Sequence, residues 1–177
     1  MDMTPRRQGL AGPVIDRKLR HNLLRYVFQC VLASLVILAV LLLLDAVHQT
    51  AIIATLGASS FIVFASPRAA SAQPRRLLGG YIVGTLAGIA CSAAAGAAGV
   101  ETLSGWHSAI ALFGALSVGL SILVMTITDT EHPPAAGAAL AYVLNEWTPL
   151  TLAVVMGAVL VLAVSKTLLR RILLDLV

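Results

Sequence analysis

Long apolar segments without a charged residue constrain the fold of this chain more than any other feature. Residues 26–44 form the first of them, and five more follow. A helix of about 20 apolar residues crosses the hydrocarbon core of a bilayer, and only 11% of the residues are charged, against about 25% in soluble domains. We therefore predict an all-α polytopic membrane protein, which excludes a soluble enzyme. The predicted membrane segments are residues 26–44, 51–65, 77–100, 106–127, 133–144 and 150–165.

The positions of the basic residues predict how these segments are oriented. If all six segments cross the membrane, all 12 Lys and Arg residues fall on one side, and each loop on the other side carries an acidic residue. Cytoplasmic loops are enriched in Lys and Arg, so that side is expected to be the cytoplasm. We predict a multi-pass protein of the inner (plasma) membrane with both termini cytoplasmic. Its parts are a basic tail at 1–25, a single transmembrane domain at 26–168 and a C-terminus at 169–177.

An offset of 80 residues aligns the two halves of the transmembrane domain, about 26–100 and 106–168. Each half contains a long apolar segment, a short one and a further one, and Gly57-Ala58 in the first short segment aligns with Gly137-Ala138 in the second. Because three crossings is an odd number, the second half enters the membrane upside down relative to the first. This order predicts six helices in a 3+3 inverted repeat, with helices two and five short, the plan common among secondary transporters.

The two short segments are shorter than a membrane of ordinary thickness requires. Fifteen helical residues rise about 22 Å, against a hydrocarbon core of about 30 Å. We expect non-helical backbone to make up the difference, so that the helix starts at Thr50 and Pro133 face each other from opposite sides. Helix starts carry positive partial charge, which suits a small anion. The alternative is a pair of ordinary short spans in locally thinned lipid.

The stretch from Thr128 to Pro134 contains most of the candidate functional residues. A helix start explains its prolines and capping residues, but a histidine beside two acids at the membrane face is costly without a partner or a function. His48 and Thr50 occupy the matching position in the first half. The candidate substrate-binding residues are His132, Pro133, Glu131, Asp129, Thr130, His48, Thr50, Gly57, Ser59 and Gly137.

The block Glu131-His132-Pro133-Pro134-Ala135, followed by Gly137, is the most distinctive in the chain. Earlier blocks are Leu56-Gly57-Ala58-Ser59-Ser60, Phe64-Ala65-Ser66-Pro67 and Ala72-Gln73-Pro74-Arg75 with Gly79-Gly80. Together they resemble the signatures of the HPP family of small integral membrane proteins, over most of residues 26–165. The resemblance implies a transporter, with nitrite transport associated with plastid and cyanobacterial members. The family is usually described with four spans. We expect six, because a hydropathy window of about 19 residues misses two short helices.

These observations favour a transporter or channel in the lipid bilayer for a small inorganic anion such as nitrite. Asp129, Glu131 and His132 are candidate gating or proton-coupling groups, because a histidine with a pKa near neutral can couple uptake to protons. The alternative is a non-transporting scaffold or a subunit of a larger membrane complex. Gly80, Gly84 and Gly88 share one helix face, and we expect them to pack within the chain, against a partner helix or in a homo-oligomer. We expect no enzymatic activity, because no nucleophile is paired with a base, and no cofactor or nucleic-acid partner. We expect no metal, because the four histidines lack paired spacing.

Overall fold

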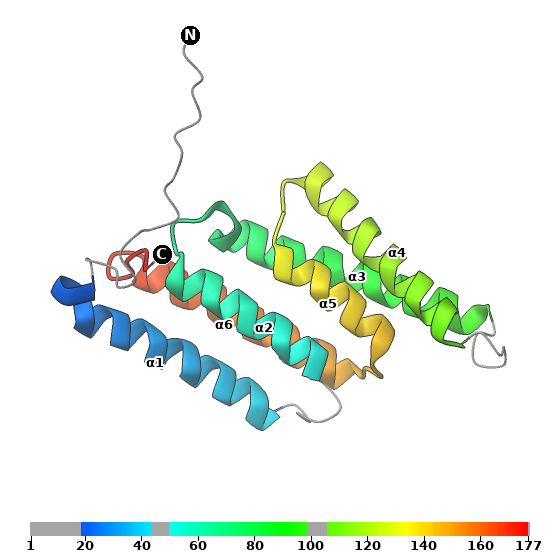
Figure 1. The fold of residues 1–177 in the computed structure, drawn as a ribbon, viewed down its shortest axis with the longest axis horizontal. Coiled ribbons are helices and arrows are strands. Elements are labelled where there is room, and N and C mark those ends of the chain that lie inside the picture. The colour runs from blue at the N-terminus through cyan, green and yellow to red at the C-terminus, as the bar shows by residue number, and fades with distance from the viewer. Residues whose placement is uncertain (1–18, 44–49, 99–105, 177) are drawn as a thin grey trace, which may run out of the picture.

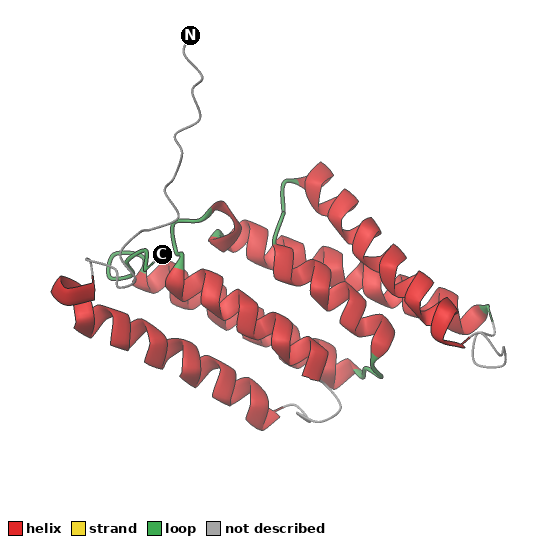
Figure 2. Cartoon of the chain, in the orientation of Figure 1, coloured by secondary structure: helices red, strands yellow, loops and turns green. Residues whose placement is uncertain are grey.

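The computed structural model describes residues 19–43, 50–98 and 106–176, and all regular secondary structure in these ranges is helical (Figures 1 and 2). The expected all-helical class and the short second and fifth helices are confirmed. The elements are α1 (Leu19–Leu43), α2 (Thr50–Ala65), the 3-10 helix η1 (Ala70–Ala72), α3 (Pro74–Ala97), α4 (Trp106–Thr128), α5 (Pro133–Leu144) and α6 (Pro149–Leu169).

Four of these helices, α1, α3, α4 and α6, are long and apolar enough to cross a membrane. The two others, α2 and α5, have 16 and 12 residues. Proline occupies the first position of α3, α5 and α6, where its missing N–H would have had no partner within the helix. The prolines therefore explain why these three helices begin where they do.

The helices form two groups that pack against each other. The first group contains α1, α2 and α6, and the second contains α3, α4 and α5 (Figure 1). Contacts of α2 with α5 and of α3 with α6 join the groups, and we call this contact region the seam. Helices α1 and α4 flank opposite sides of the molecule, because α1 packs on α2 and α6 whereas α4 packs on α3 and α5.

Helices α3 and α5 approach each other closely along the glycine face of α3. A Cβ atom added at Gly84 would lie 2.2 Å from the carbonyl oxygen of Ala135, and one at Gly88 would lie 2.6 Å from that of Ala139. At Gly80 the same atom would lie 2.7 Å from Cβ of His132. Of the three packing modes that the sequence left open, the structure has the one within the chain. Because α5 covers Gly80, Gly84 and Gly88, this face of α3 is not free to contact a second copy or a partner helix.

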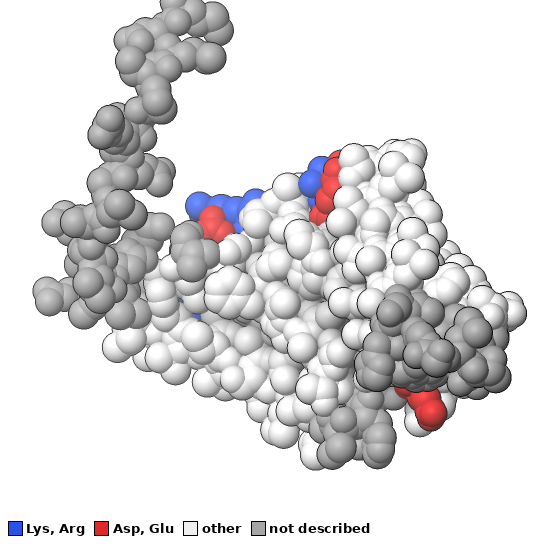
Figure 3. Space-filling model, turned by 45° about the vertical axis from the view of Figure 1, so that its right-hand side comes forward, with Lys and Arg blue, Asp and Glu red and all other residues white. Residues whose placement is uncertain are grey.

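One end of the molecule gathers most of the described charged residues (Figure 3). The end of α2 and the start of α3 lie at this end together with the start of α1 and the ends of α4 and α6 (Figure 1). At this end, an ion pair of 3.5 Å also links Arg68, which follows α2, to Asp175, which follows α6. We call this end of the molecule the basic end. Among the described connections, those after α2, α4 and α6 lie at the basic end, and the connection between α5 and α6 lies at the other end (Figure 1).

Candidate functional site

A fully buried histidine stands between the two helix groups. His132 precedes the first residue of α5 and is 0% exposed. Its Nδ1 atom lies 2.8 Å from the carbonyl oxygen of Ser71 in η1, and its Nε2 atom lies 2.8 Å from Oγ of Ser59 in α2. Both ring nitrogens therefore have partners from outside α5, and the ring links α5 to α2 and η1.

The hydrogen bonds continue from Ser59 across the seam. Its Oγ atom lies 2.9 Å from the hydroxyl oxygen of Tyr81 in α3, which in turn lies 3.3 Å from Oγ1 of Thr55 in α2. Thr55 donates to the carbonyl oxygen of Ile52 at 2.7 Å. We call His132, Ser59, Tyr81 and Thr55 the seam chain. Ser59 and Tyr81 are fully buried like His132, so the seam chain is a row of polar groups inside an apolar interior.

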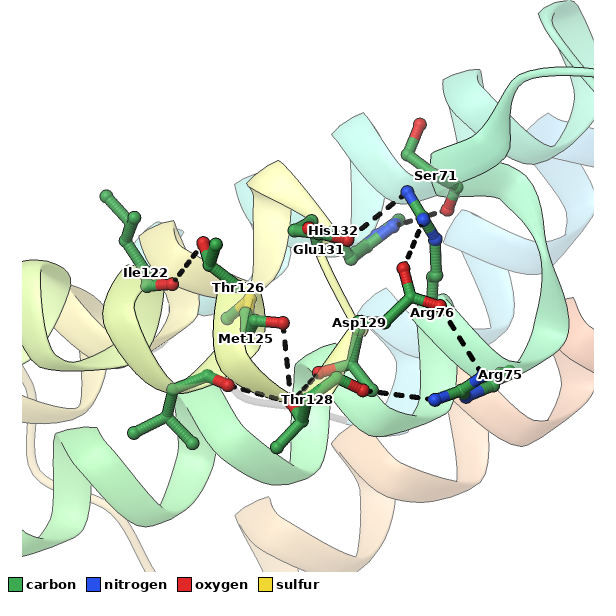
Figure 4. Close-up of polar contacts among 12 residues, drawn as sticks. Ser71, Arg75, Arg76, Ile122, Met125, Thr126, Thr128, Asp129, Glu131 and His132 are labelled. Atoms are coloured by element: carbon green, nitrogen blue, oxygen red, sulfur yellow. Dashed lines mark hydrogen bonds and ion pairs between the residues drawn. The ribbon is translucent and has the colours of Figure 1, made fainter.

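A cluster of ion pairs covers the basic end beside His132 (Figure 4). Arg76 at the start of α3 pairs with Asp129 and, at 3.2 Å, with Glu131. Arg75 lies 3.4 Å from Asp129 and donates to the carbonyl oxygen of Thr128 at 3.1 Å. Two arginines therefore meet two carboxylates, and the charges of the cluster balance. The cluster ties the segment between α4 and α5 to α3.

Asp129 has a backbone conformation that most residues avoid. Its φ of 52° lies in the left-handed region, where Asp and Asn are enriched because their short polar side chains form local hydrogen bonds. This turn ends α4, and the chain then runs in extended form to the start of α5 (Figure 1). Thr130 within this run is buried, with its Oγ1 atom 2.8 Å from that of Thr128.

A mostly apolar pocket of about 310 Å³ lies between α4 and α5. Its polar walls are formed by Thr126, Glu131 and His132, so the imidazole forms part of the pocket as well as of the seam chain. The remaining lining residues are Ile122, Met125, Pro133 and Ala136. The pocket has room for a small solute beside His132, which has no exposed surface in this conformation.

The structure brings together six of the ten candidates: His132 and Ser59 in the seam chain, and Asp129, Thr130, Glu131 and Pro133 in the segment beside it. A seventh candidate, Gly137, lies across the seam from Thr55, whose Cγ2 atom would be 3.2 Å from an added Cβ. Gly57 is apart from the site, because it lines a groove between α1 and α2. Thr50 is exposed at the first turn of α2, and His48 lies outside the described residues.

The expectation that the starts of α2 and α5 face each other is wrong. His132 at the start of α5 bonds to Ser59 in the middle of α2, and Gly137 one turn further along α5 lies opposite Thr55, one turn earlier in α2. The two helices therefore run antiparallel and side by side. The physical reason is close packing, because this arrangement brings small and apolar side chains of both helices together, including Ile52, Leu56, Ala135 and Ala138.

Several site residues were missed by reasoning from the sequence. Tyr81, Thr55 and the carbonyl of Ser71 complete the hydrogen bonding of His132 and Ser59, and Arg76 pairs with both acids. A signal existed for Thr55, which lies four residues before Ser59 and hence on the same helix face. Tyr81 was also detectable as a hydroxyl-bearing residue within a long apolar segment.

Comparisons with known proteins agree with this membrane architecture. A family model described as "HPP, transmembrane region" matches residues 18–172. A relative from Dictyostelium discoideum, named only as a transmembrane protein, is 34% identical over 102 residues, which cover 58% of this chain and 33% of that protein. The match therefore spans about a third of the length of that relative. No solved structure matches the present chain. Because the family model covers most of the chain, the protein belongs to the HPP family of transmembrane proteins.

Proposed function

We propose that this protein is a transporter or channel for a small inorganic anion such as nitrite, and that the solute passes along the seam. The observation that carries the proposal is the buried seam chain. Polar side chains within a membrane domain are costly and commonly mark solute pathways. Hydrogen bonds to their own helix account for Thr55 and for one bond of Ser59. They do not account for His132 and Tyr81, which bond across the seam.

The packing of the helices supports the inverted repeat that such a transporter would use. Exchanging α1, α2 and α3 with α4, α5 and α6 maps the contacts onto one another: α1 with α2 corresponds to α4 with α5, α1 with α6 to α4 with α3, and α2 with α6 to α5 with α3. Each group thus takes two helices from one half and one from the other. Relative motion of two such groups around a fixed site is the usual basis of alternating access.

The preference for an anion rests on the surroundings of the site. The start of α5 carries the positive partial charge of a helix N-terminus. His132 directly precedes Pro133, the first residue of this helix. The basic end also attracts anions from solution, because Arg75 and Arg68 are well exposed.

Transport is tested with purified protein in liposomes. We expect nitrite uptake at least tenfold faster than in empty vesicles, and we expect His132→Ala to remove most of that difference, because the substitution removes the ring that joins the seam chain to the pocket. Ser34→Ala is the control, since Ser34 is an exposed residue of α1 that bonds only to its own helix at Cys30. Equal fluxes for the wild-type protein and empty vesicles, with nitrite and with a panel of other small anions, would contradict the proposal.

Membrane sidedness is a separate part of the proposal. We infer six crossings of the plasma membrane with both termini in the cytoplasm, so that the basic end faces the cytoplasm. Reporter fusions at residues 47, 72, 103 and 146 test this, with a cytoplasmic signal expected only at 72. External signals at both 47 and 72 would show that α2 does not cross.

A further inference from the structure

We propose that the anion crosses together with a proton, and that this proton binds at Nε2 of His132. The inference rests on the proposed function, and it names the coupling ion and the atom that takes it. Three observations carry it: the charge balance around the site, the hydrogen bonds of the ring, and the pocket beside it.

The charge balance leaves no counter-charge for an anion. The arginines nearest His132 are already engaged, because Arg76 pairs with Asp129 and Glu131 while Arg75 pairs with Asp129. An anion that leaves water without a compensating charge pays a large desolvation penalty. A protonated His132 supplies the missing positive charge and makes the site with its anion neutral.

The other described groups around the ring do not supply that charge. From α3 the ring meets Tyr81, with the two ring centroids 5.6 Å apart, and from α2 it meets the Ser59 hydroxyl. From η1 it meets a backbone carbonyl, and the α4 wall of the pocket consists of uncharged side chains. Glu131, the neighbour in the chain, is acidic. The titratable ring is therefore the group that can change the charge of the pocket.

The hydrogen bonds identify the atom that takes the proton. The carbonyl oxygen of Ser71 only accepts, so Nδ1 of His132 donates to it and carries a hydrogen in both states of the ring. In the neutral ring, Nε2 is then an acceptor and Ser59 donates to it. Proton binding forms an N–H bond at Nε2, with the proton coming from water.

Ser59 can adapt to this change without losing its hydrogen bonds. Once Nε2 carries a hydrogen, it donates to Oγ of Ser59, and the Ser59 hydroxyl turns to the carbonyl oxygen of Thr55, which already lies 3.0 Å away. Tyr81 can donate to Ser59 or to Thr55 in either state. Both protonation states of the buried ring are therefore fully hydrogen-bonded, which is what a reversible proton site requires.

The pocket between α4 and α5 places solute and proton together. His132 and Glu131 both form its wall, and the Glu131 side chain is partly exposed at the basic end, where it meets Arg76. An anion in the pocket would lie beside His132, and the half-exposed carboxylate offers a route for the proton from solution. Coupling then follows because the anion and the proton each lower the free-energy cost of burying the other.

The coupling is tested in proteoliposomes with the membrane potential clamped by potassium and valinomycin. We expect a gradient of one pH unit, acidic outside, to drive about tenfold nitrite accumulation over empty vesicles, and a potential alone to drive none, as an electroneutral one-to-one symport requires. We expect His132→Gln to lose the pH-driven accumulation, and Ser34→Ala to retain it. Accumulation driven by the potential and insensitive to pH would overturn the coupling while leaving anion transport intact.

A second measurement tests the proton site without transport. Histidine labelled with ¹⁵N in lipid nanodiscs reports the tautomer and protonation of each ring, and the signal lost in His132→Gln assigns His132. We expect the Nδ1–H tautomer at about pH 8 and protonation at Nε2 on lowering the pH, with the midpoint shifted by Ser59→Ala. An Nε2–H neutral tautomer, or a ring that stays neutral down to about pH 4, would overturn the assignment whatever the fluxes show.

Discussion

Gly84→Ala is expected to destabilise the protein by about 3 kcal/mol, because the added methyl group has no space between α3 and α5. Its Cβ would lie 2.2 Å from the carbonyl oxygen of Ala135 and 3.0 Å from the carbonyl carbon. These are backbone atoms near the start of α5, so relief requires the two helices to move apart. That movement would also separate Gly80 from His132 and disturb the seam chain.

The measurement is the free energy of unfolding in mixed micelles under denaturing detergent. Gly96→Ala is the matched control, because Gly96 lies on the same helix with nothing within 4 Å of an added Cβ. There alanine should be neutral or stabilise by up to about 1 kcal/mol, since glycine is a poor helix former. Similar stabilities for the two variants would mean that α3 and α5 do not pack as closely as described.

Gln29→Leu is expected to release the C-terminal segment, residues 170–176, from the basic end. Gln29 in α1 is 1% exposed, and its amide nitrogen donates to the carbonyl oxygens of Phe64 and Leu174, the latter at 3.0 Å. Its amide oxygen accepts from the backbone N–H of Leu174 at 3.2 Å. Leucine leaves these backbone groups without their partners, at a cost of about 2–4 kcal/mol.

Release is measured by the labelling rate of a cysteine at position 174. The background is Leu174→Cys with Cys30→Ser and Cys91→Ala, and the reagent is a water-soluble maleimide. We expect at least tenfold faster labelling with Gln29→Leu, because the segment loses its two hydrogen bonds to Gln29 and keeps mainly the contacts of Asp175 with Arg68 and of Leu176 with Ala65. Ser34→Ala, on the same helix, should leave the rate unchanged. An unchanged rate with Gln29→Leu would show that the tail is held by other contacts.

Helix positions were predictable from the sequence to a good approximation. The range 133–144 agrees with α5 residue by residue, and 51–65 differs from α2 at one position. The start of α3 was placed three residues late, because Pro74 begins the helix ahead of the apolar run. The start of α1 was placed seven residues late, at Tyr26 instead of Leu19. Apolar length marks the part of a helix that meets lipid, whereas capping residues and backbone geometry decide where the helix itself begins.

His132 and Ser59 could be singled out from the sequence, whereas the contact between them could not. His132 stood out because an ionisable ring inside a membrane domain needs a partner, and Ser59 belonged to a polar pair in a short segment. That these two residues bond to each other depends on the relative register of α2 and α5. The 80-residue offset between the two halves does not predict that register. The offset shows which positions of α2 and α5 are equivalent in the two halves, but not which of them contact each other.

The amino-acid sequence by itself determined that this is an all-helical membrane protein and, to a good approximation, which residues form its helices. These properties follow from local physics, namely the cost of placing charge and unpaired backbone in hydrocarbon. Only the tertiary structure decided that α5 covers Gly80, Gly84 and Gly88, that Arg76 pairs with both acids, and that Tyr81 and Ser71 complete the hydrogen bonds of His132 and Ser59. The reason is that each of these depends on which helix faces meet, and close packing between distant segments selects those faces.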